Sequence, residues 1–257
     1  MFRRSFIQFL EKEGVEYSLR GDAFLFKKGA LEVILIPKGV EVKGDILEYQ
    51  GDDGVVYDRL YLYEDRWVSG GDVLKKRILS RMGYFESVFA RKCEVVSGGK
   101  IAENVSGFLD KYHSYGRAKC KYRYALMYKG EMVAAATFSS PRPMPREDGR
   151  TYLSFEWVRY ASVSGMRVVG GMGKLLKSFV EDALAIGERE GMPVEIMSYS
   201  DNEWSSGDVY NRLGFRKIGD RDPVRYFVDS KTYTRYSLRK YALLAAEGVS
   251  FYEISNQ

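Results

Sequence analysis

A glycine-rich segment, residues 167–176, has the residue types that point most directly to ligand binding. It reads RVVGGMGKLL, so three glycines fall within the four positions 170–173. Glycine lets the backbone approach a ligand closely, and a helix that begins here directs unpaired N–H groups and the positive end of its dipole at that ligand. The segment therefore predicts an anion-binding turn. Its predicted ligand-binding residues are Val168, Val169, Gly170, Gly171, Met172, Gly173 and Lys174.

Two carboxylates, one before and one after this turn in the sequence, could accept a proton. The first is Glu156. Residues 152–162 alternate as a strand does, because successive side chains of a strand point to opposite faces. The alternation predicts one face with Leu153, Phe155, Trp157 and Arg159, and a second face with Ser154, Glu156, Val158 and Tyr160. A strand carboxylate among partly apolar neighbours is a candidate general base. An ion pair of Glu156 with Arg159 or Lys174 is the competing interpretation.

Asp201 is the second such carboxylate. It follows a predicted strand, residues 194–199, and the carboxyl ends of strands are where open α/β sheets bind ligands. A turn or N-cap carboxylate in the sequence Asp201-Asn202 is an equally good interpretation. His113 is the only histidine of the chain, and at a predicted helix end it is more typical of a capping or surface residue than of a catalytic one.

A helix over 173–190 must follow the glycine turn, because its apolar residues recur at helical spacing and Gly191 ends the pattern. Two alternating segments joined by Lys129-Gly130 predict a long hairpin. Pro141, Pro143 and Pro145 predict a loop that cannot continue the sheet. The other elements expected after residue 90 are a strand over 92–96, helices over 102–112 and 208–213, and strands over 215–218 and 224–228.

The first part of the chain predicts a small helix-plus-sheet unit of its own. Its expected elements are a helix over 2–12, a hairpin over 23–37, a strand over 57–63 and a helix over 72–82. We therefore predict two domains, residues 1–90 and residues 91–257. The fold class is α+β or α/β, with a mixed, mostly antiparallel sheet flanked by helices.

The composition, with 257 residues of which 45% are hydrophobic, predicts a packed globular protein without a membrane span, and a cytoplasmic location is the default. The two cysteines, Cys93 and Cys120, have no metal-like spacing, so no metal is expected.

The net charge of +5 permits a nucleic-acid partner without predicting one. On a strand, alternating basic residues would form a single stripe, although a solvated face is the more common explanation. The alternating residues are Arg117, Lys119, Lys121 and Arg123.

Over residues 93–230, the order of elements and the ending Tyr210-Asn211-Arg212-Leu213-Gly214-Phe215 resemble the GNAT acyltransferase superfamily. The resemblance implies that Gly171 and Gly173 bind the pyrophosphate of acetyl-CoA or another acyl-CoA, and that Tyr210 is the general acid that protonates the departing thiolate. Glu156 or Asp201 would then be the base that takes a proton from the acceptor amine. The glycine turn departs from the family pattern, since a register counted from Arg167 puts Met172 in the last glycine position.

Several segments look like the GNAT-like domain of phage Mom-type DNA modification proteins and of phage homing-endonuclease-like chains. They include Phe155-Glu156-Trp157-Val158-Arg159-Tyr160 and Ser198-Tyr199-Ser200-Asp201. This resemblance implies a site at Asp201 and Tyr199, a nucleic-acid target, and a shortened nuclease-like N-terminal domain without the acidic pair that would hold magnesium. The sequence leaves open the acceptor amine, the acyl group and the oligomeric state.

Overall fold

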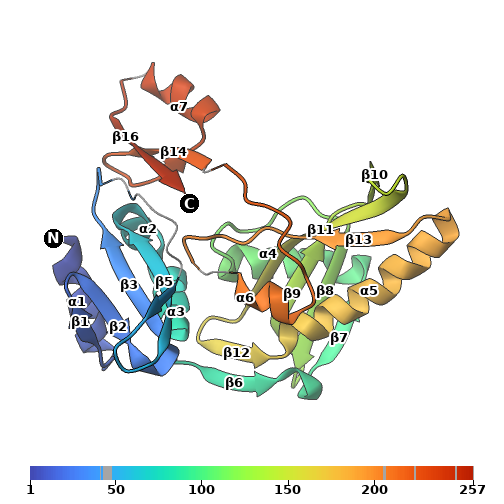
Figure 1. Ribbon diagram of the computed structural model, residues 1–257, viewed down its shortest axis with the longest axis horizontal. Coiled ribbons are helices and arrows are strands. Elements are labelled where there is room, and N and C mark those ends of the chain that lie inside the picture. Colours follow the sequence, from blue (N-terminus) through green and yellow to red (C-terminus); the bar gives the residue numbers. More distant parts are fainter. Residues whose placement is uncertain (41, 43–47, 205–206, 223, 247, 257) are drawn as a thin grey trace. The chain divides into compact units, whose positions relative to one another are not determined.

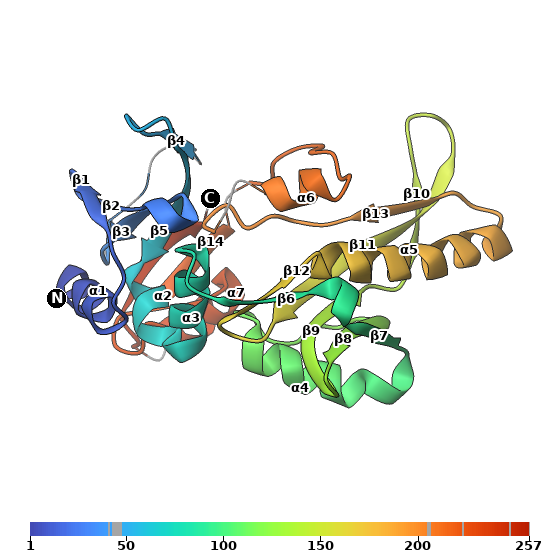
Figure 2. The same cartoon turned by 90° about the horizontal axis from the view of Figure 1, so that it is seen from below.

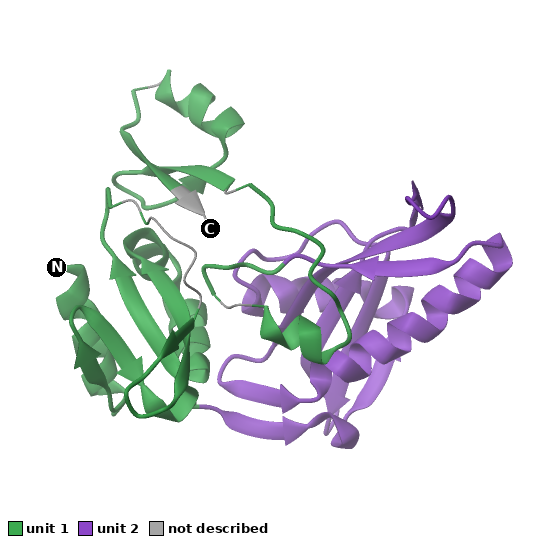
Figure 3. Cartoon of the chain, in the orientation of Figure 1, with its two compact units in different colours: residues 1–84, 200–257 green, residues 85–199 purple. Residues whose placement is uncertain are grey.

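The computed structural model describes residues 1–40, 42, 48–204, 207–222, 224–246 and 248–256. The chain divides into two compact units, residues 1–84 with 200–257, and residues 85–199 (Figure 3). The sequence-based division instead placed all of 91–257 in one domain. Each unit is a helix-plus-sheet structure, and each is described by itself below.

The unit of residues 85–199 is built on a six-stranded sheet (Figure 1). Its strand order is β10-β11-β9-β8-β7, and β13 pairs with β11. All pairs are antiparallel except β11 with β13, which run parallel. The strands are β7 (Glu94–Ser97), β8 (Tyr122–Tyr128), β9 (Glu131–Phe138), β10 (Arg142–Pro145), β11 (Thr151–Ser162) and β13 (Val194–Met197). The mixed, mostly antiparallel sheet confirms the predicted fold class.

Two helices cover opposite faces of this sheet (Figure 2). Helix α4 (Ala102–Tyr112) packs Val105 and Leu109 against Ala135 of β9. Helix α5 (Gly171–Glu190) packs Phe179 on the other face, where its ring stacks on Phe138 at 3.7 Å between centroids. Two further strands, β6 (Glu86–Phe89) and β12 (Met166–Val169), form a separate parallel pair, and two 3-10 turns are η2 (Ala90–Lys92) and η3 (Gly99–Ile101).

The predicted proline loop is wrong, because Arg142–Pro145 forms the edge strand β10. Proline cannot donate a hydrogen bond to a neighbouring strand, so it is accepted in a sheet only where that side faces solvent. Pro143 and Pro145 are two residues apart, and therefore both can turn their nitrogen atoms away from β11. Residues 215–218, predicted as a strand, have no regular structure.

The other unit has a five-stranded sheet of order β1-β2-β3-β5-β4, in which only β3 and β5 run parallel. The strands are β1 (Ser18–Arg20), β2 (Ala23–Phe26), β3 (Leu31–Ile36), β4 (Glu48–Gln50) and β5 (Val56–Tyr63), with the turn η1 (Lys27–Gly29). The helices of residues 1–84 are α1 (Phe2–Lys12), α2 (Glu64–Ser69) and α3 (Gly71–Arg81). They cover one face of the sheet, where Leu31, Leu60 and Ile78 are fully buried.

The C-terminal region of this unit contains α6 (Asp208–Arg212), β14 (Val224–Asp229), β15 (Arg235–Tyr236), α7 (Leu238–Ala245) and β16 (Phe251–Asn256). Of these elements, β14 and β16 pack on the second face of the five-stranded sheet. Val228 and Ile254 lie in a cluster with Ile36 of β3. The buried Arg235 also donates hydrogen bonds to two buried carboxylates, Asp65 and Glu203. These contacts explain why residues 200–257 belong with 1–84.

Candidate functional site

The glycine turn forms the N-terminus of α5. Gly170 is the N-cap residue and has φ +77°, a left-handed conformation that glycine adopts without steric strain. The helix begins at Gly171, two residues earlier than predicted, and the amide of Lys174 donates to the carbonyl of Gly170 at 3.0 Å. Among the residues that the structure describes, no side chain caps this end of the helix, and no acidic residue lies in its first turn. The first amides and the helix dipole together favour an anion at this end.

Gly171 lets the start of α5 pack closely against β11 and β12. A Cβ atom at this position would lie 2.9 Å from Tyr160 Oη and 3.0 Å from Val168 Cβ. The first distance is shorter than real Cβ contacts and the second is tighter than most of them, so a side chain at this position would displace its neighbours. Tyr160 itself is mostly buried, and burial raises the pKa of its hydroxyl.

Lys174 was predicted to bind the ligand, but in the structure its ammonium group binds the protein backbone. Its Nζ donates to the carbonyl oxygens of Ala90, at 3.1 Å, and of Cys93. These bonds fasten the start of α5 to the segment that enters β7. A cation in the first turn of a helix is repelled by the positive end of the helix dipole, at a cost of about 0.3–1 kcal/mol. Lys174 thus adds positive charge at the end of α5 where an anion is already favoured.

A β-bulge in β11 changes which side chains share a face of the sheet. The register with β9 shifts between Trp157 and Arg159, so that Val158 is an extra residue. Trp157 packs on Phe138 with its ring on the α5 face. After the bulge, Arg159 lies on the α4 face, where its Nε donates to the carbonyl of Gly116 at 3.3 Å. The predicted common face of Trp157 and Arg159 is therefore wrong.

Glu156 lies just before the bulge, on the face that α5 does not cover. Its neighbour Phe155 contacts Phe179 of α5, and alternation directs the Glu156 side chain the other way. The carboxylate is 3.8 Å from Arg142 of β10, and 29% of the Glu156 side chain is exposed. Its predicted ion-pair partners, Arg159 and Lys174, bind backbone carbonyls instead. The charge partner is thus Arg142, in a segment that the sequence predicted to lie outside the sheet.

The backbone around Glu156 is held in place from both sides. The amide of Glu156 donates to Ser139 Oγ at 2.9 Å, and its carbonyl accepts from the amide of Ser139 at 2.9 Å. On the other side, pairing with β13 ends at Glu156 opposite Met197, although β11 continues to Ser162. The edge of β11 beyond Trp157 therefore has no further pairing with β13. Sequence reasoning missed Ser139, since a serine after a strand has no distinctive signal.

The two other predicted catalytic residues, Asp201 and Tyr210, belong to the unit of residues 1–84 and 200–257. Asp201 Oδ1 accepts a hydrogen bond from the amide of Glu203 at 3.1 Å, as a turn carboxylate does. Tyr210 lies on α6, and its ring meets Phe215 edge-on at 5.6 Å. Glu156 and the glycine turn belong to the unit of residues 85–199. The catalytic roles of Asp201 and Tyr210 stay predictions.

The predicted basic stripe of residues 117–123 does not form. Strand β8 begins only at Tyr122, and Arg117 pairs with Asp110 of α4. Lys121 lies before the strand, and Arg123 donates to its carbonyl at 3.4 Å. His113 is the C-cap residue of α4, as its position in the sequence indicated.

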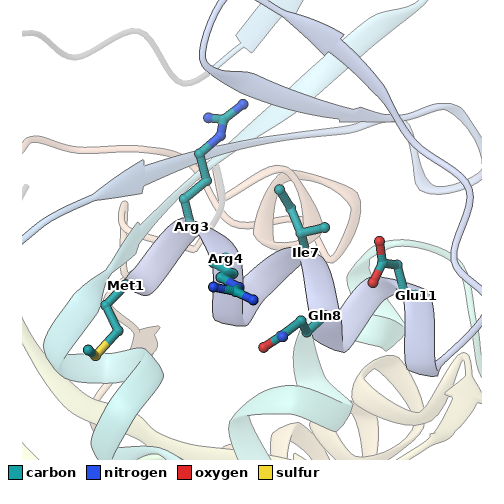
Figure 4. Close-up of a pocket in the computed structure, with 6 residues that line it drawn as sticks. All are labelled: Met1, Arg3, Arg4, Ile7, Gln8 and Glu11. Carbon is teal, nitrogen blue, oxygen red and sulfur yellow. The ribbon is translucent and has the colours of Figure 1, made fainter.

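A hollow of about 560 Å³ lies on α1, and none of the predicted site residues lines it (Figure 4). All six residues that line it come from the start of the chain, so that it is an open surface of one helix. They are Met1, Arg3, Arg4, Ile7, Gln8 and Glu11. Within the described ranges, no group of three or more His, Cys, Asp or Glu residues could hold a metal ion, and no helix has the length and apolar character to cross a membrane.

The unit of residues 85–199 thus combines an antiparallel sheet, a parallel strand pair and a glycine turn at the start of the helix between its strands, which is consistent with a GNAT-like fold. Similar solved structures include the aminoglycoside N-acetyltransferase AAC(6')-Iy in complex with CoA, at 16% identity over 50% of this chain and 95% of that chain, with a TM-score of 0.35. A Trypanosoma brucei acetyltransferase is 15% identical over 50% and 96%, with a TM-score of 0.33. An integron cassette protein of V. cholerae is 14% identical over 60% and 98%, with a TM-score of 0.37. No protein-family model and no curated protein matches the sequence.

Proposed function

We propose that the chain is an acyl-CoA-dependent N-acyltransferase whose acyl donor binds the unit of residues 85–199. The observation that supports this most is the uncapped N-terminus of α5 at the glycine turn. It directs several amides and the helix dipole at one point, and a pyrophosphate is the kind of anion that such a turn binds. Acetyl-CoA or another acyl-CoA carries this group together with a reactive thioester.

The residues that would hold the donor follow from this geometry. The amides of Gly171, Met172 and Gly173 would bind the pyrophosphate. The edge of β11 beyond Trp157 would pair with the amide-bearing pantetheine arm, since an extended ligand can add to an open strand edge. When bound, CoA supplies an acyl group activated as a thioester.

Glu156 would act as the base toward the acceptor amine. In the transfer, the amine nitrogen bonds to the acyl carbonyl carbon and loses a proton to Glu156, directly or through a water molecule, while the carbon–sulfur bond breaks. The departing thiolate takes up a proton, for which Tyr210 is the proposed donor. Asp201 is the alternative base.

A substitution at Met172 tests the donor site with opposite effects on folding and on binding. Met172→Asp places a carboxylate in the first turn of α5, where the dipole stabilises it by about 0.3–1 kcal/mol. The same carboxylate repels a pyrophosphate. Calorimetric titration with acetyl-CoA should therefore show at least tenfold weaker binding to Met172→Asp than to the uncharged control Met172→Asn, at equal or higher thermal stability. Absence of binding to the wild type at millimolar acetyl-CoA would exclude this function.

A Mom-like protein that acts on nucleic acid is the second proposal. One observation favours it: Lys119 and Lys121, both exposed before β8, have no carboxylate partner in the part of the chain that the structure describes. Binding through such residues would weaken steeply between about 50 and 200 mM salt, because each phosphate contact releases counterions. A fluorescence anisotropy titration of a short DNA at both salt concentrations tests it. Binding that salt leaves unchanged would exclude this mode.

A further inference from the structure

Three polar residues form a row across the sheet of residues 85–199. Thr137 of β9 is directly opposite Arg123 of β8 on one side and opposite Arg159 of β11 on the other. Residues that are directly paired across strands point to the same face, so all three side chains lie on the face that α4 partly covers. Neighbouring strands are about 4.8 Å apart, so the two arginines flank Thr137 across a span of about 10 Å at the backbone.

Two donors in this row are buried without any hydrogen bond. Thr137 is 1% exposed, and neither its Oγ1 nor Arg123 Nε has a partner among the residues that the structure describes. A buried donor without a partner costs about 1–3 kcal/mol, so most proteins satisfy such groups. Two hydrogen-bond donors without a partner, on residues that are paired directly across two strands, therefore indicate a place where an oxygen atom of a ligand can bind.

The row is also positively charged, and neither arginine forms an ion pair with a carboxylate of the described residues. Within the described ranges, no acidic oxygen lies within 4.0 Å of the guanidinium groups of Arg123 and Arg159. Arg123 donates only to the carbonyls of Cys120 and Lys121, at 3.3 and 3.4 Å. Arg159 donates from Nε to the carbonyl of Gly116 at 3.3 Å and from Nη1 to that of Val158 at 2.9 Å. The bonds to Cys120, Lys121 and Gly116 are longer than the usual 2.7–3.2 Å, whereas bonds to a charged oxygen are shorter and about twice as strong. Both guanidinium groups can thus gain by exchanging a carbonyl for an oxyanion.

The bulge brings this row next to the candidate base. Without the extra residue Val158, Arg159 would lie on the face opposite to Glu156, but with it the two side chains follow each other on one face. A molecule bound there would place one group near a carboxylate and another near two arginines. We propose that Arg123, Thr137 and Arg159 bind the carboxylate or phosphate group of an acceptor whose amine reacts beside Glu156. The acceptor is then an anionic amine, and this inference rests on the proposed acyltransferase function.

Anion binding can be measured without any acyl transfer. Inorganic phosphate is titrated into the full chain, and the side-chain Nε–H signals of Arg123 and Arg159 are followed by NMR, after assignment with single Arg→Lys variants. Both signals should shift with one common dissociation constant. Thr137→Val should weaken this constant about tenfold, the value of one hydrogen bond to a charged group. The control Thr151→Val, at an exposed position on the same sheet, should not change it.

The stability of Thr137→Val separates a ligand-binding hydroxyl from a structural one. Because the hydroxyl has no partner among the described residues, its removal should leave the thermal midpoint of the free protein unchanged or raise it. A clearly lower midpoint would show that the hydroxyl serves the fold, and would overturn the inference. Phosphate shifts that are equally strong in Thr137→Val and in Arg159→Gln would also overturn it.

Acyl transfer then distinguishes the two kinds of anion. Transfer from acetyl-CoA is compared between β-alanine and propylamine, which differ by a carboxylate, and between phosphoethanolamine and ethanolamine, which differ by a phosphate. At least one anionic amine should have a KM about tenfold or more below that of its neutral counterpart. In Arg123→Gln and Arg159→Gln, the KM values of the anionic amine and its neutral counterpart should agree within about twofold. In the control Arg150→Gln, whose side chain is 65% exposed, the difference in KM should persist.

The two proposals fail in different ways. If acetyl-CoA binds but neither anionic amine is preferred, the acceptor inference is wrong and the donor site stands. If acetyl-CoA does not bind, the acyltransferase function is wrong. The phosphate titration then still decides whether the row binds an anion.

Discussion

Replacing Gly171 by alanine tests whether close packing fixes the start of α5. Alanine normally stabilises a helix by about 0.5–1 kcal/mol relative to glycine. Here the new Cβ would lie 2.9 Å from Tyr160 Oη and 3.0 Å from Val168 Cβ. Overpacking of this kind costs about 1–3 kcal/mol, so the expected net result is a loss of about 1 kcal/mol in the free energy of unfolding. The displaced turn should also bind acetyl-CoA more weakly.

Gly107 offers a matched control within the same unit. It lies in the middle of α4, and a Cβ there would meet nothing within 4 Å. Gly107→Ala should therefore raise stability by about 0.5–1 kcal/mol, opposite in sign to Gly171→Ala. Urea unfolding followed by circular dichroism measures both changes, and calorimetric titration measures acetyl-CoA binding.

A double mutant identifies the atom responsible. Tyr160→Phe removes the hydroxyl at 2.9 Å and leaves the contact with Val168, so Gly171→Ala combined with Tyr160→Phe should recover part of the lost stability. The interaction energy between the two substitutions measures that recovery. If Gly171→Ala proves as stabilising as Gly107→Ala, the packing argument for the turn is refuted.

Three further predictions concern other contacts. Tyr124→Phe should lower stability by about 1–2 kcal/mol in urea unfolding, because the buried hydroxyl of Tyr124 donates to Asp182 of α5. A hydrogen bond from Arg146 lowers the pKa of Glu195, so the pair stabilises the fold above the ordinary carboxylate pKa, and this stability is lost as the pH falls. Arg146→Gln should therefore lower the thermal midpoint at pH 7 and leave it almost unchanged at pH 2. Tyr210→Phe should lower kcat at least tenfold without changing acetyl-CoA affinity, and an unchanged kcat would exclude the general-acid role.

Local patterns in the sequence determined the regular elements around the site. The hairpin of β8 and β9 has the predicted ends, because Lys129 and Gly130 both adopt positive φ, at 51° and 84°, as a two-residue hairpin turn requires. Helices α4 and α5 follow apolar residues at helical spacing, and each pattern depends only on neighbours a few positions away. The glycine turn was visible for the same reason.

Only the tertiary structure decided how these elements combine. The bulge at Val158 depends on the register between β11 and β9, and it reversed the predicted face of Arg159. The prolines of β10 are compatible with a strand only because that strand lies at the edge of the sheet. The row of Arg123, Thr137 and Arg159 joins residues from three strands. Alternation within one strand gives side-chain faces, but which residues become neighbours is set by pairing between strands, and no single segment carries that information.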